Sequence, residues 1–423
     1  MIFNLEQYSS NVALITDRGE SISYCELSKR VKYRATELKR GVLQFCLCKN
    51  DIKTVVEYLA CLEAGAPVVL LDSNKDFETI EHLRRIYRPC ETKCHPNLAL
   101  CLTTSGSTGS PKLVRLTKRN ILANAESIAD YLQIDENERP ITMLPMYYSY
   151  GLSIINSHLL KGATILLTDK TYAQREFWNF LKDNRATSMS GVPYTWELLR
   201  RLRFMRMDLP SVKTMTQAGG KLNAEIAKEY IQWAKSQSKR FIVMYGQTEA
   251  TARMSYLPWE KAEEKYASIG VAIPGGDFSL AEDGELIYNG ENVSMGYADC
   301  AEDLMKGDEN HGILHTGDMA RMDEDGFYYI TGRKKRFVKI WGNRCNLDQI
   351  EQIVKTVTTS CACAGVDDKV TVFVTHEGLD KAIIDLLVSK TGLNQIAFHI
   401  KQIDTIPITP SGKIDYPQLQ QMI

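Results

Sequence analysis

The chain has 423 residues, of which 44% are hydrophobic and 24% are charged. This length and composition are typical of an ordinary globular protein with two to four domains, each able to bury its own core. Lys and Arg total 51 against 52 for Asp and Glu, and the formal net charge of -1 excludes a general attraction to nucleic acid or anionic lipid.

The amino terminus has none of the features of a secretory signal. It carries an acid, Glu6, and lacks a basic start followed by an apolar core. No apolar run approaches the roughly 20 residues that a membrane span needs. The cysteines number 11, an odd and scattered set that is typical of reduced thiols rather than a disulfide framework. We therefore expect a cytoplasmic protein with no membrane span and no nucleic-acid partner.

The tightest grouping of metal-binding residue types is Cys90, Cys94, His95 and Cys101. A structural zinc site needs a second ligand pair at a suitable spacing. No such pair follows in the sequence, which disfavours a zinc site.

Helix-like and strand-like segments alternate through the first part of the chain. Residues 55–65 predict a helix that ends at a glycine, and residues 67–72 predict a buried strand. The alternation continues with a strand over 163–169, a helix over 177–184 and a strand over 240–246. Strands and helices that take turns predict a layered α/β sheet.

The pattern of expected secondary structure changes near residue 275. From there, short strand-like segments are separated by glycines, as in 284–290 and 326–332, which predicts an antiparallel lobe. The basic stretch 332–344 follows, and we expect a domain boundary there, with Lys334 to Arg336 as a linker or hinge. The run of charge is equally typical of a solvated surface.

The segment from Leu102 to Lys112, LTTSGSTGSPK, is rich in glycine, serine and threonine. Such a segment is either a flexible turn or a cradle in which backbone N–H groups, hydroxyls and a lysine hold phosphate groups. It is not the common P-loop, because Lys112 follows a proline and precedes a leucine.

Three further motifs follow in order: YGQTEA (245–250), HTGDMARMDEDGFYYITGRKKR (315–336) and ITPSGKID (408–415). Together with TTSGSTGSPK they resemble the acyl-adenylate-forming superfamily, which comprises acyl-CoA and aryl-CoA synthetases, peptide-synthetase adenylation domains and luciferases. Weaker similarities at SYCEL (23–27), EYLACLEAGAPVVLLD (57–72) and GELIYNGENVSMGY (284–297) extend the resemblance over nearly the whole chain.

The resemblance implies an α/β fold in two domains. Residues 1–334 would form a large N-terminal adenylation domain of layered αβαβα sheets plus a small antiparallel β-lobe. Residues 335–423 would form a small mobile α+β C-terminal domain that carries the catalytic lysine. The implied activity is the ATP- and Mg2+-dependent activation of a carboxylic acid as acyl-AMP with release of pyrophosphate, followed by acyl transfer to a thiol.

The resemblance also implies which residues hold ATP. Glu249 matches the magnesium-binding carboxylate, and carboxylate oxygens suit magnesium; Thr248 matches a phosphate-contacting hydroxyl. The adenine would lie between Tyr245, with Gly246, and the loop of Gly219 and Gly220. The residues that would grip the β- and γ-phosphates are Thr104, Ser105, Gly106, Ser107, Thr108, Gly109 and Lys112.

The resemblance of the last two motifs implies the ribose contacts, the hinge and the catalytic lysine. Asp318 and Arg333 match residues that bind the ribose hydroxyls, and two carboxylate oxygens suit a vicinal diol. Lys335 takes the position of the hinge about which the small domain rotates between half-reactions. Lys413 matches the lysine that bridges the carboxylate and the α-phosphate, where its charge offsets developing negative charge.

The chain departs from the family in two places. The region before the phosphate loop is shorter than usual, so part of the first subdomain is trimmed. In 145–153, where domains for α-amino acids carry an aspartate for the substrate ammonium, this chain has Tyr147, Tyr148 and Tyr150 and no acid. A buried ammonium without a partner is costly, which disfavours an α-amino acid substrate.

The acid pocket would be lined by Tyr148, by Gly191 and Tyr194, and by the 218–222 loop. Tyr194 and Trp196 are equally typical of core residues that do not line the pocket. The acyl acceptor is either coenzyme A or the phosphopantetheine of an acyl or peptidyl carrier protein. The arginines at 200, 201, 203 and 206 suit the coenzyme A phosphate, and helical amphipathicity explains them as well. The alternative function is a non-catalytic nucleotide-binding or partner-binding member of the same fold.

Overall fold

The computed structural model describes residues 2–87, 93–103, 112–334, 336–409 and 414–423, and not the side chains of 343 and 344. The described chain divides into two compact units, one made of residues 1–278 and 288–314 and the other of residues 279–287 and 315–423. The predicted boundary between residues 334 and 335 stays a prediction. No helix in the described part of the chain is long and apolar enough to cross a bilayer.

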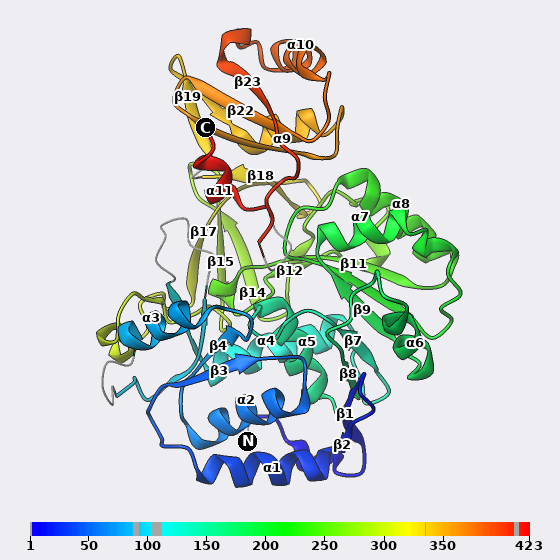
Figure 1. The fold of residues 1–423 in the computed structure, drawn as a ribbon, viewed down its shortest axis with the longest axis vertical. Coiled ribbons are helices and arrows are strands. Elements are labelled where there is room, and N and C mark those ends of the chain that lie inside the picture. The colour runs from blue at the N-terminus through cyan, green and yellow to red at the C-terminus, as the bar shows by residue number, and fades with distance from the viewer. Residues whose placement is uncertain (1, 88–92, 104–111, 335, 410–413) are drawn as a thin grey trace. The chain divides into compact units, whose positions relative to one another are not determined.

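The first unit contains a five-stranded sheet (Figure 1). β3, β4 and β5 are parallel; β6 pairs with β5 in antiparallel orientation, and β16 pairs antiparallel with β6. In spatial order the strands are β16 (Tyr297–Ala298), β6 (Leu113–Thr117), β5 (Leu98–Thr103), β4 (Val68–Asp72) and β3 (Gln44–Cys48). The predicted buried strand at 67–72 is therefore confirmed as β4.

A nine-stranded sheet, also in the first unit, has a parallel centre and antiparallel edges. Its spatial order is β13 (Val271–Ala272), β12 (Ser255–Tyr256), β11 (Arg240–Tyr245), β10 (Thr214–Gln217), β9 (Ser188–Gly191), β7 (Pro140–Thr142), β8 (Ile165–Leu167), β1 (Val12–Thr16) and β2 (Ser21–Ser23). The predicted strands at 163–169 and 240–246 are confirmed as β8 and β11.

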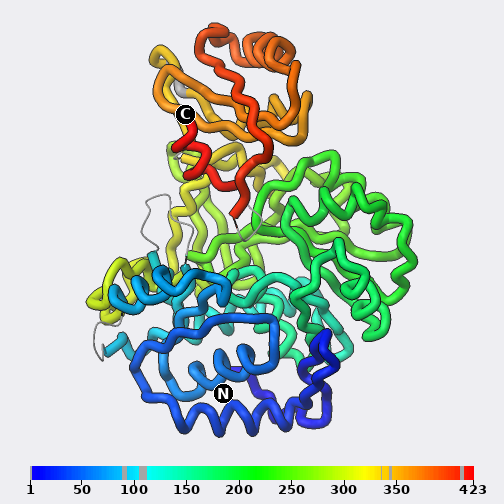
Figure 2. The backbone as a smooth tube through the Cα atoms, viewed as in Figure 1, coloured from blue at the N-terminus to red at the C-terminus, as the bar shows by residue number. Residues whose placement is uncertain are grey.

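The helices of the first unit cover and separate the two sheets (Figures 1 and 2). They are α1 (Tyr24–Thr36), α2 (Ile52–Ala64), α3 (Phe77–Tyr87), α4 (Lys118–Tyr131), α5 (Ser149–Leu160), α6 (Arg175–Asp183), α7 (Pro193–Arg201) and α8 (Ala224–Ser236). α4 and α5 share one core with the five-stranded sheet and another with β11 of the nine-stranded sheet. They therefore form a layer between the two sheets, as the sequence predicted.

Local signals explain where two of these helices begin and end. The Asp51 side chain accepts a hydrogen bond from the Thr54 N–H at the start of α2, and Gly65 ends the helix in the left-handed region at φ 65°. The start of α4 has a capping box, in which Thr117 and Asn120 exchange side-chain to backbone hydrogen bonds. This box fixes the turn by which β6 leads into α4.

The predicted antiparallel lobe is a four-stranded sheet with the order β14 (Gly276–Leu280), β15 (Glu285–Gly290), β17 (Ile313–Met322) and β18 (Tyr328–Arg333). The division between the two units falls inside β14, β15 and β17. β17 and β18 form an antiparallel pair in which Asp318 lies opposite Arg333.

The rest of the second unit is a small α+β arrangement around one core. β19 (Phe337–Ile340) and β20 (Asn343–Asn346) form a hairpin. β21 (Cys361–Val366), β22 (Lys369–Val374) and β23 (Phe398–Gln402) form a three-stranded sheet. The helices are α9 (Leu347–Val354), α10 (Asp380–Thr391) and α11 (Tyr416–Gln420).

Candidate active site

The predicted phosphate loop connects two neighbouring antiparallel strands. Thr103 at the end of β5 lies opposite Leu113 at the start of β6, so the two ends of the loop are held together. Thr104, Ser105, Gly106, Ser107, Thr108 and Gly109 lie outside the described residues. Lys112 is described, and its ammonium lies 3.2 Å from the carboxylate of Asp299 and 5.8 Å from the centre of the Tyr297 ring.

Thr248 and Glu249 lie in a short turn that follows β11. The Thr248 hydroxyl is 3.2 Å from the hydroxyl of Ser149, at the start of α5. One oxygen of the Glu249 carboxylate accepts a hydrogen bond of 2.7 Å from the Tyr297 hydroxyl. Burial raises the pKa of Tyr297 and the neighbouring carboxylate raises it further, so this tyrosine stays a neutral donor.

The Glu249 carboxylate suits the predicted magnesium site. One of its oxygens is held by Tyr297, and no other described side chain is bonded to the second oxygen. A partly exposed carboxylate fixed at one oxygen is the kind of hard ligand that magnesium takes alongside substrate phosphates. The donor set therefore fits the metal, with Glu249 as the residue that would hold it.

Tyr297 reaches Glu249 because β16 pairs with β6. Tyr297 lies opposite Val114, two residues after Lys112, so the strand that leaves the phosphate loop also places the tyrosine. The Ser294 N–H donates 2.8 Å to the Glu249 carbonyl and adds a backbone bond between the same two segments. Lys112, Tyr297 and Glu249 are thereby gathered at one end of the five-stranded sheet.

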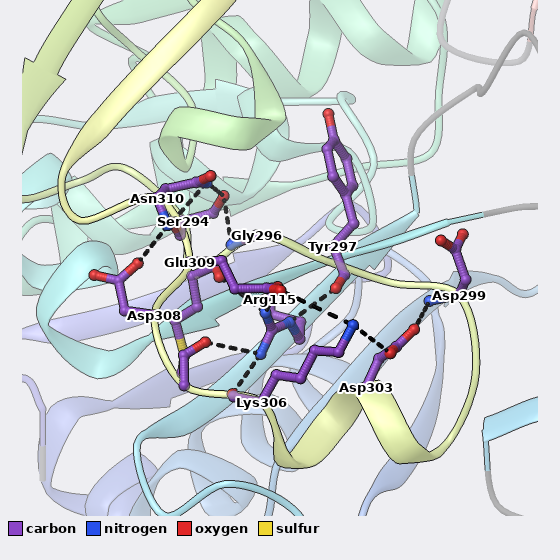
Figure 3. A network of polar contacts seen from close by, with 12 residues as sticks. Arg115, Ser294, Gly296, Tyr297, Asp299, Asp303, Lys306, Asp308, Glu309 and Asn310 are labelled. Carbon is purple, nitrogen blue, oxygen red and sulfur yellow. Dashed lines mark hydrogen bonds and ion pairs between the residues drawn. The ribbon is translucent and has the colours of Figure 1, made fainter.

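Arg115 holds the segment that carries Tyr297 (Figure 3). Its side chain is fully buried, and its guanidinium donates to the carbonyls of Tyr297 at 3.0 Å and Met295 at 2.9 Å. It also donates to the carbonyls of Lys306 and Gly307 and pairs with the carboxylate of Glu309. One β6 side chain therefore fixes both ends of the 295–309 segment.

The residues predicted at the adenine lie at the ends of β10 and β11. Gly219 has φ +83°, and a Cβ there would lie 2.3 Å from the Tyr148 hydroxyl. A Cβ at Gly246 would lie 1.8 Å from the carbonyl oxygen of Ala252. Both positions therefore require glycine. Gly220 lies next to Pro193, and the half-buried Tyr245 ends β11.

The residues predicted at the acid pocket fall into two environments. Tyr148 lies next to Gly219, whereas Gly191 lies against Thr195 and Trp196 on α7. Trp196 is buried and donates 3.1 Å to the Gly191 carbonyl, so it is a core residue. Tyr194 is 51% exposed and is not a core residue.

In the second unit, the structure brings together the two residues predicted at the ribose. The Arg333 Nε lies 3.3 Å from the Asp318 carboxylate, whose side chain is 7% exposed. The backbone N–H of Arg333 donates a hydrogen bond of 3.0 Å to the carboxylate of Asp348 on α9. The predicted hinge, Lys335, and the predicted catalytic lysine, Lys413, lie outside the described residues.

Sequence reasoning gave no role to three residues of this region: Ser149, Tyr297 and Arg253. Tyr297 ends the GELIYNGENVSMGY stretch, so its place in a family-like motif was the signal that could have found it. Arg253 lies three residues beyond YGQTEA, and its type alone indicates an exposed position. It is instead 2% exposed.

The weak zinc grouping does not form a metal site among the described residues, where no three such side chains could hold a metal ion. Cys90 lies outside them. Cys94 and Cys101 are buried thiols, and burial raises the pKa of Cys94 to about 11.

Comparison with known proteins connects this geometry to a family. Residues 75–298, more than half of the chain, match the family described as AMP-binding enzyme. A 2-succinylbenzoate--CoA ligase of Listeria innocua is 25% identical over 394 residues, which cover 91% of this chain and 82% of the ligase. A 2-succinylbenzoate--CoA ligase of Staphylococcus aureus is 26% identical over 339 residues, which cover 76% of this chain and 67% of the ligase.

Solved structures share the whole fold. The O-succinylbenzoate coenzyme A synthetase (MenE) from Bacillus subtilis, in complex with AMP, superposes with a TM-score of 0.82 at 20% identity, covering 98% of this chain and 97% of that one. ATP-bound MatB from Rhodopseudomonas palustris gives 0.81 at 20% identity, covering 99% and 98%. The predicted α/β fold is confirmed, and the chain belongs to the AMP-binding enzyme family, as its motifs indicated.

Proposed function

We propose that this chain is an AMP-forming acid–CoA ligase. A carboxylate oxygen of the acid attacks the α-phosphorus of ATP, and pyrophosphate leaves as acyl-AMP forms. The sulfur of coenzyme A then attacks the acyl carbon, the thiol proton is lost to solvent, and AMP leaves with the oxygen that came from the acid. The first step needs orientation and charge stabilisation more than it needs a base.

One observation carries the proposal: Lys112, Tyr297 and Glu249 converge at the end of the predicted phosphate loop, with Glu249 held at 2.7 Å. Lys112 supplies positive charge toward the phosphates, and Tyr297 orients the carboxylate that would hold Mg2+. Bound magnesium would neutralise charge on the triphosphate. Thr248 precedes Glu249 in sequence, its hydroxyl lies 3.2 Å from that of Ser149, and this pair would supply further donors to phosphate oxygens.

The second unit supplies the remaining roles. Asp318 and Arg333, already paired across β17 and β18, would bind the ribose hydroxyls. Lys413 would place its charge between the carboxylate and the α-phosphate. Residues 335–423 would rotate about Lys335 between the half-reactions, while residues 1–334 hold ATP and the acid.

Two features guide the choice of substrates. Tyr148, next to Gly219, stands where an α-amino acid would need an acidic partner, which supports an acid without an ammonium group. The similar proteins whose names include CoA ligase support coenzyme A, rather than a carrier protein, as the acceptor. Arg200, one of the arginines considered for the coenzyme A phosphate, pairs with Glu229 at 2.6 Å on an exposed surface.

The test is acid-dependent release of pyrophosphate from ATP and magnesium, measured over a panel of aliphatic, hydroxylated, aryl and dicarboxylic acids. We expect release with at least one acid and a coenzyme A thioester when the thiol is added. The Lys413→Ala variant is the control, because it should lose release while keeping ATP binding. ATP binding without release for any acid would contradict the proposal and favour a non-catalytic member of the fold.

A further inference from the structure

Glu285 is a buried carboxylate to which the proposed function gives no role. It lies at the start of β15, in the GELIYNGENVSMGY stretch, and its side chain is 7% exposed. β15 is the neighbour of β17, the strand that carries Asp318. A buried carboxylate is costly unless its oxygens are bonded, so its partners indicate what it holds in place.

Each oxygen of this carboxylate has a partner from a different segment. Oε1 accepts a hydrogen bond of 2.9 Å from the backbone N–H of Gly317 on β17. Oε2 accepts one of 2.9 Å from the ammonium of Lys334, which follows β18, and the exposed imidazole of His315 lies 3.6 Å from the same oxygen. Burial favours the neutral acid, but these partners outweigh it and hold the pKa of Glu285 below its usual value. The carboxylate is therefore ionised at neutral pH.

Gly317 is held through both its N–H and its carbonyl. The N–H donates to Glu285, and the carbonyl accepts a hydrogen bond of 2.7 Å from the backbone N–H of Lys334. Gly317 has φ +69°, in the left-handed region that favours glycine. Because the Glu285 carboxylate also binds the Lys334 ammonium, this one side chain ties β17 to the residue that follows β18.

Asp318 is the next residue along the chain. Its backbone N–H donates a hydrogen bond of 3.1 Å to the hydroxyl of Thr316, which in turn donates one of 2.7 Å to the carbonyl of Leu286 on β15. The segment around Asp318 is therefore attached to β15 at two points, the Glu285 carboxylate and the Leu286 carbonyl. The Asp318 carboxylate, 3.3 Å from Nε of Arg333, takes its direction from this segment.

We propose that Glu285 is a positioning residue for nucleotide recognition: by binding Gly317 and Lys334, it holds the Asp318 carboxylate in the direction that the ribose hydroxyls require. This inference rests on the proposed function, which assigns the ribose to Asp318. A binding group keeps its full effect only when the residues behind it fix its geometry. Loss of the Glu285 carboxylate should therefore weaken the recognition of the ribose hydroxyls and spare the contacts to the base and the phosphates.

The experiment measures nucleotide binding without turnover. Calorimetry with magnesium present and no acid compares ATP with 2′-deoxyATP and 3′-deoxyATP. We expect the unsubstituted protein to bind ATP about 10-fold more tightly than at least one deoxynucleotide, the effect of one hydrogen bond to a charged group. The Asp318→Ala variant, which removes the acceptor itself, should lose this preference.

Variants at Glu285 locate the effect. Glu285→Leu, which removes both acceptor oxygens, should reduce the preference to about 3-fold or less and leave the affinity for the deoxynucleotides nearly unchanged. Glu285→Gln keeps one oxygen for the Gly317 N–H and should keep most of the preference. Asp283→Asn is the matched control, because Asp283 binds the same Lys334 ammonium at 2.7 Å. If Glu285→Leu does not fold, Glu285→Asp replaces it, since its carboxylate is one methylene shorter and should also reduce the preference.

The proposal is overturned if the unsubstituted protein has no preference for ATP, or if the variant that removes or shortens the Glu285 side chain keeps it. Equal weakening of ATP and both deoxynucleotides would also overturn it, because Glu285 would then act on stability alone. Failure of the proposed function is a separate result. A preference that depends on Glu285, without acid-dependent release of pyrophosphate, would support the positioning role and reject the ligase. Release of pyrophosphate with a preference that survives in Glu285→Leu would support the ligase and reject the positioning role.

Discussion

Two arginines of the first unit are almost fully buried, and their surroundings differ. Arg115 is 0% exposed and donates to four backbone carbonyls and to Glu309 (Figure 3). Arg253 is 2% exposed, and its partners are the Ser153 and Tyr131 hydroxyls, the Met244 sulfur and the face of Tyr150. The same side chain is fully bonded in one place and incompletely bonded in the other.

The difference lies in how completely the fold bonds each guanidinium. A buried guanidinium whose hydrogen bonds are met by the fold ties segments together, as Arg115 ties β6 to the 295–309 segment. A buried guanidinium with weaker partners acts instead on its neighbours, as Arg253 helps to lower the pKa of His158. The surroundings of the two positions should therefore respond differently to substitution and to pH.

The largest expected effect is on stability at Arg115. The Arg115→Met variant should lose about 3–5 kcal/mol of unfolding free energy, because it leaves several carbonyls without their buried donor and breaks the ion pair with the half-exposed Glu309. The midpoint of thermal or urea unfolding measures this loss. The control is Arg119→Met, whose ion pair with Glu291 is exposed on both sides and should contribute less than about 1 kcal/mol. Equal losses at the two positions would contradict a structural role for Arg115.

Substitution of the predicted metal ligand should act on activity instead. Glu249→Gln should lower kcat/KM for acid-dependent pyrophosphate release by roughly 10²–10³-fold, since transition-state charge is no longer stabilised. Its unfolding midpoint should change little, because Glu249 is only partly buried. Steady-state kinetics over a series of magnesium concentrations measure the effect. Glu260→Gln, on an exposed turn, is the control, and activity equal to that control would remove Glu249 from the site.

The buried histidine near Arg253, His158, predicts that the free energy of unfolding depends on pH. Burial, with a smaller contribution from the Arg253 charge, lowers the pKa of His158 to about 4. In the unfolded chain the His158 imidazole binds a proton as the pH falls below about 6.5. In the folded chain it binds that proton only near pH 4. Stability contributed by neutral His158 is complete above pH 6.5 and falls by roughly 3 kcal/mol toward pH 4.

Urea unfolding between pH 7 and pH 4 measures this effect. The His158→Gln variant, which can keep a hydrogen bond to the Ile154 carbonyl, should show a smaller loss of stability over that range. The exposed His311→Gln variant is the control. An identical pH dependence in the unsubstituted protein and in His158→Gln would contradict a neutral, buried histidine.

The smallest expected effect is at Tyr297. Tyr297→Phe removes the hydroxyl that holds Glu249 and keeps the ring beside Lys112. We expect roughly 10-fold lower kcat/KM, the effect of one hydrogen bond to a charged group. The loss should shrink at high magnesium, because the tyrosine orients a metal ligand rather than touching the reacting atoms. Tyr33→Phe, an exposed position, is the control, and a loss independent of magnesium would contradict this role.

Much of the fold could be predicted from the sequence, because periodicity and glycine stops report local structure. The segments at 67–72 and 240–246 are buried strands, and Gly65 ends α2 as expected. The order of the motifs indicated the family, which the comparisons confirm.

The spatial part of the site could not be predicted in the same way. Tyr297 and Glu249 are 48 residues apart, and they meet only because β16 pairs with β6, which two strand residues do not reveal in a sequence. Arg253 is a residue type that is almost always exposed, and only the packing of Tyr150, Ser153 and Met244 around it shows that it is buried.

The most direct test of activation through an acyl adenylate follows an oxygen atom of the acid's carboxylate. The reaction is run with a turned-over acid whose carboxylate carries ¹⁸O, with ATP, magnesium and coenzyme A, and the nucleotide product is examined by mass spectrometry. We expect AMP that carries one labelled oxygen, because the acid attacks the α-phosphorus and AMP leaves with that oxygen. Unlabelled AMP, or label in ADP or inorganic phosphate, would contradict activation of the acid through an acyl adenylate.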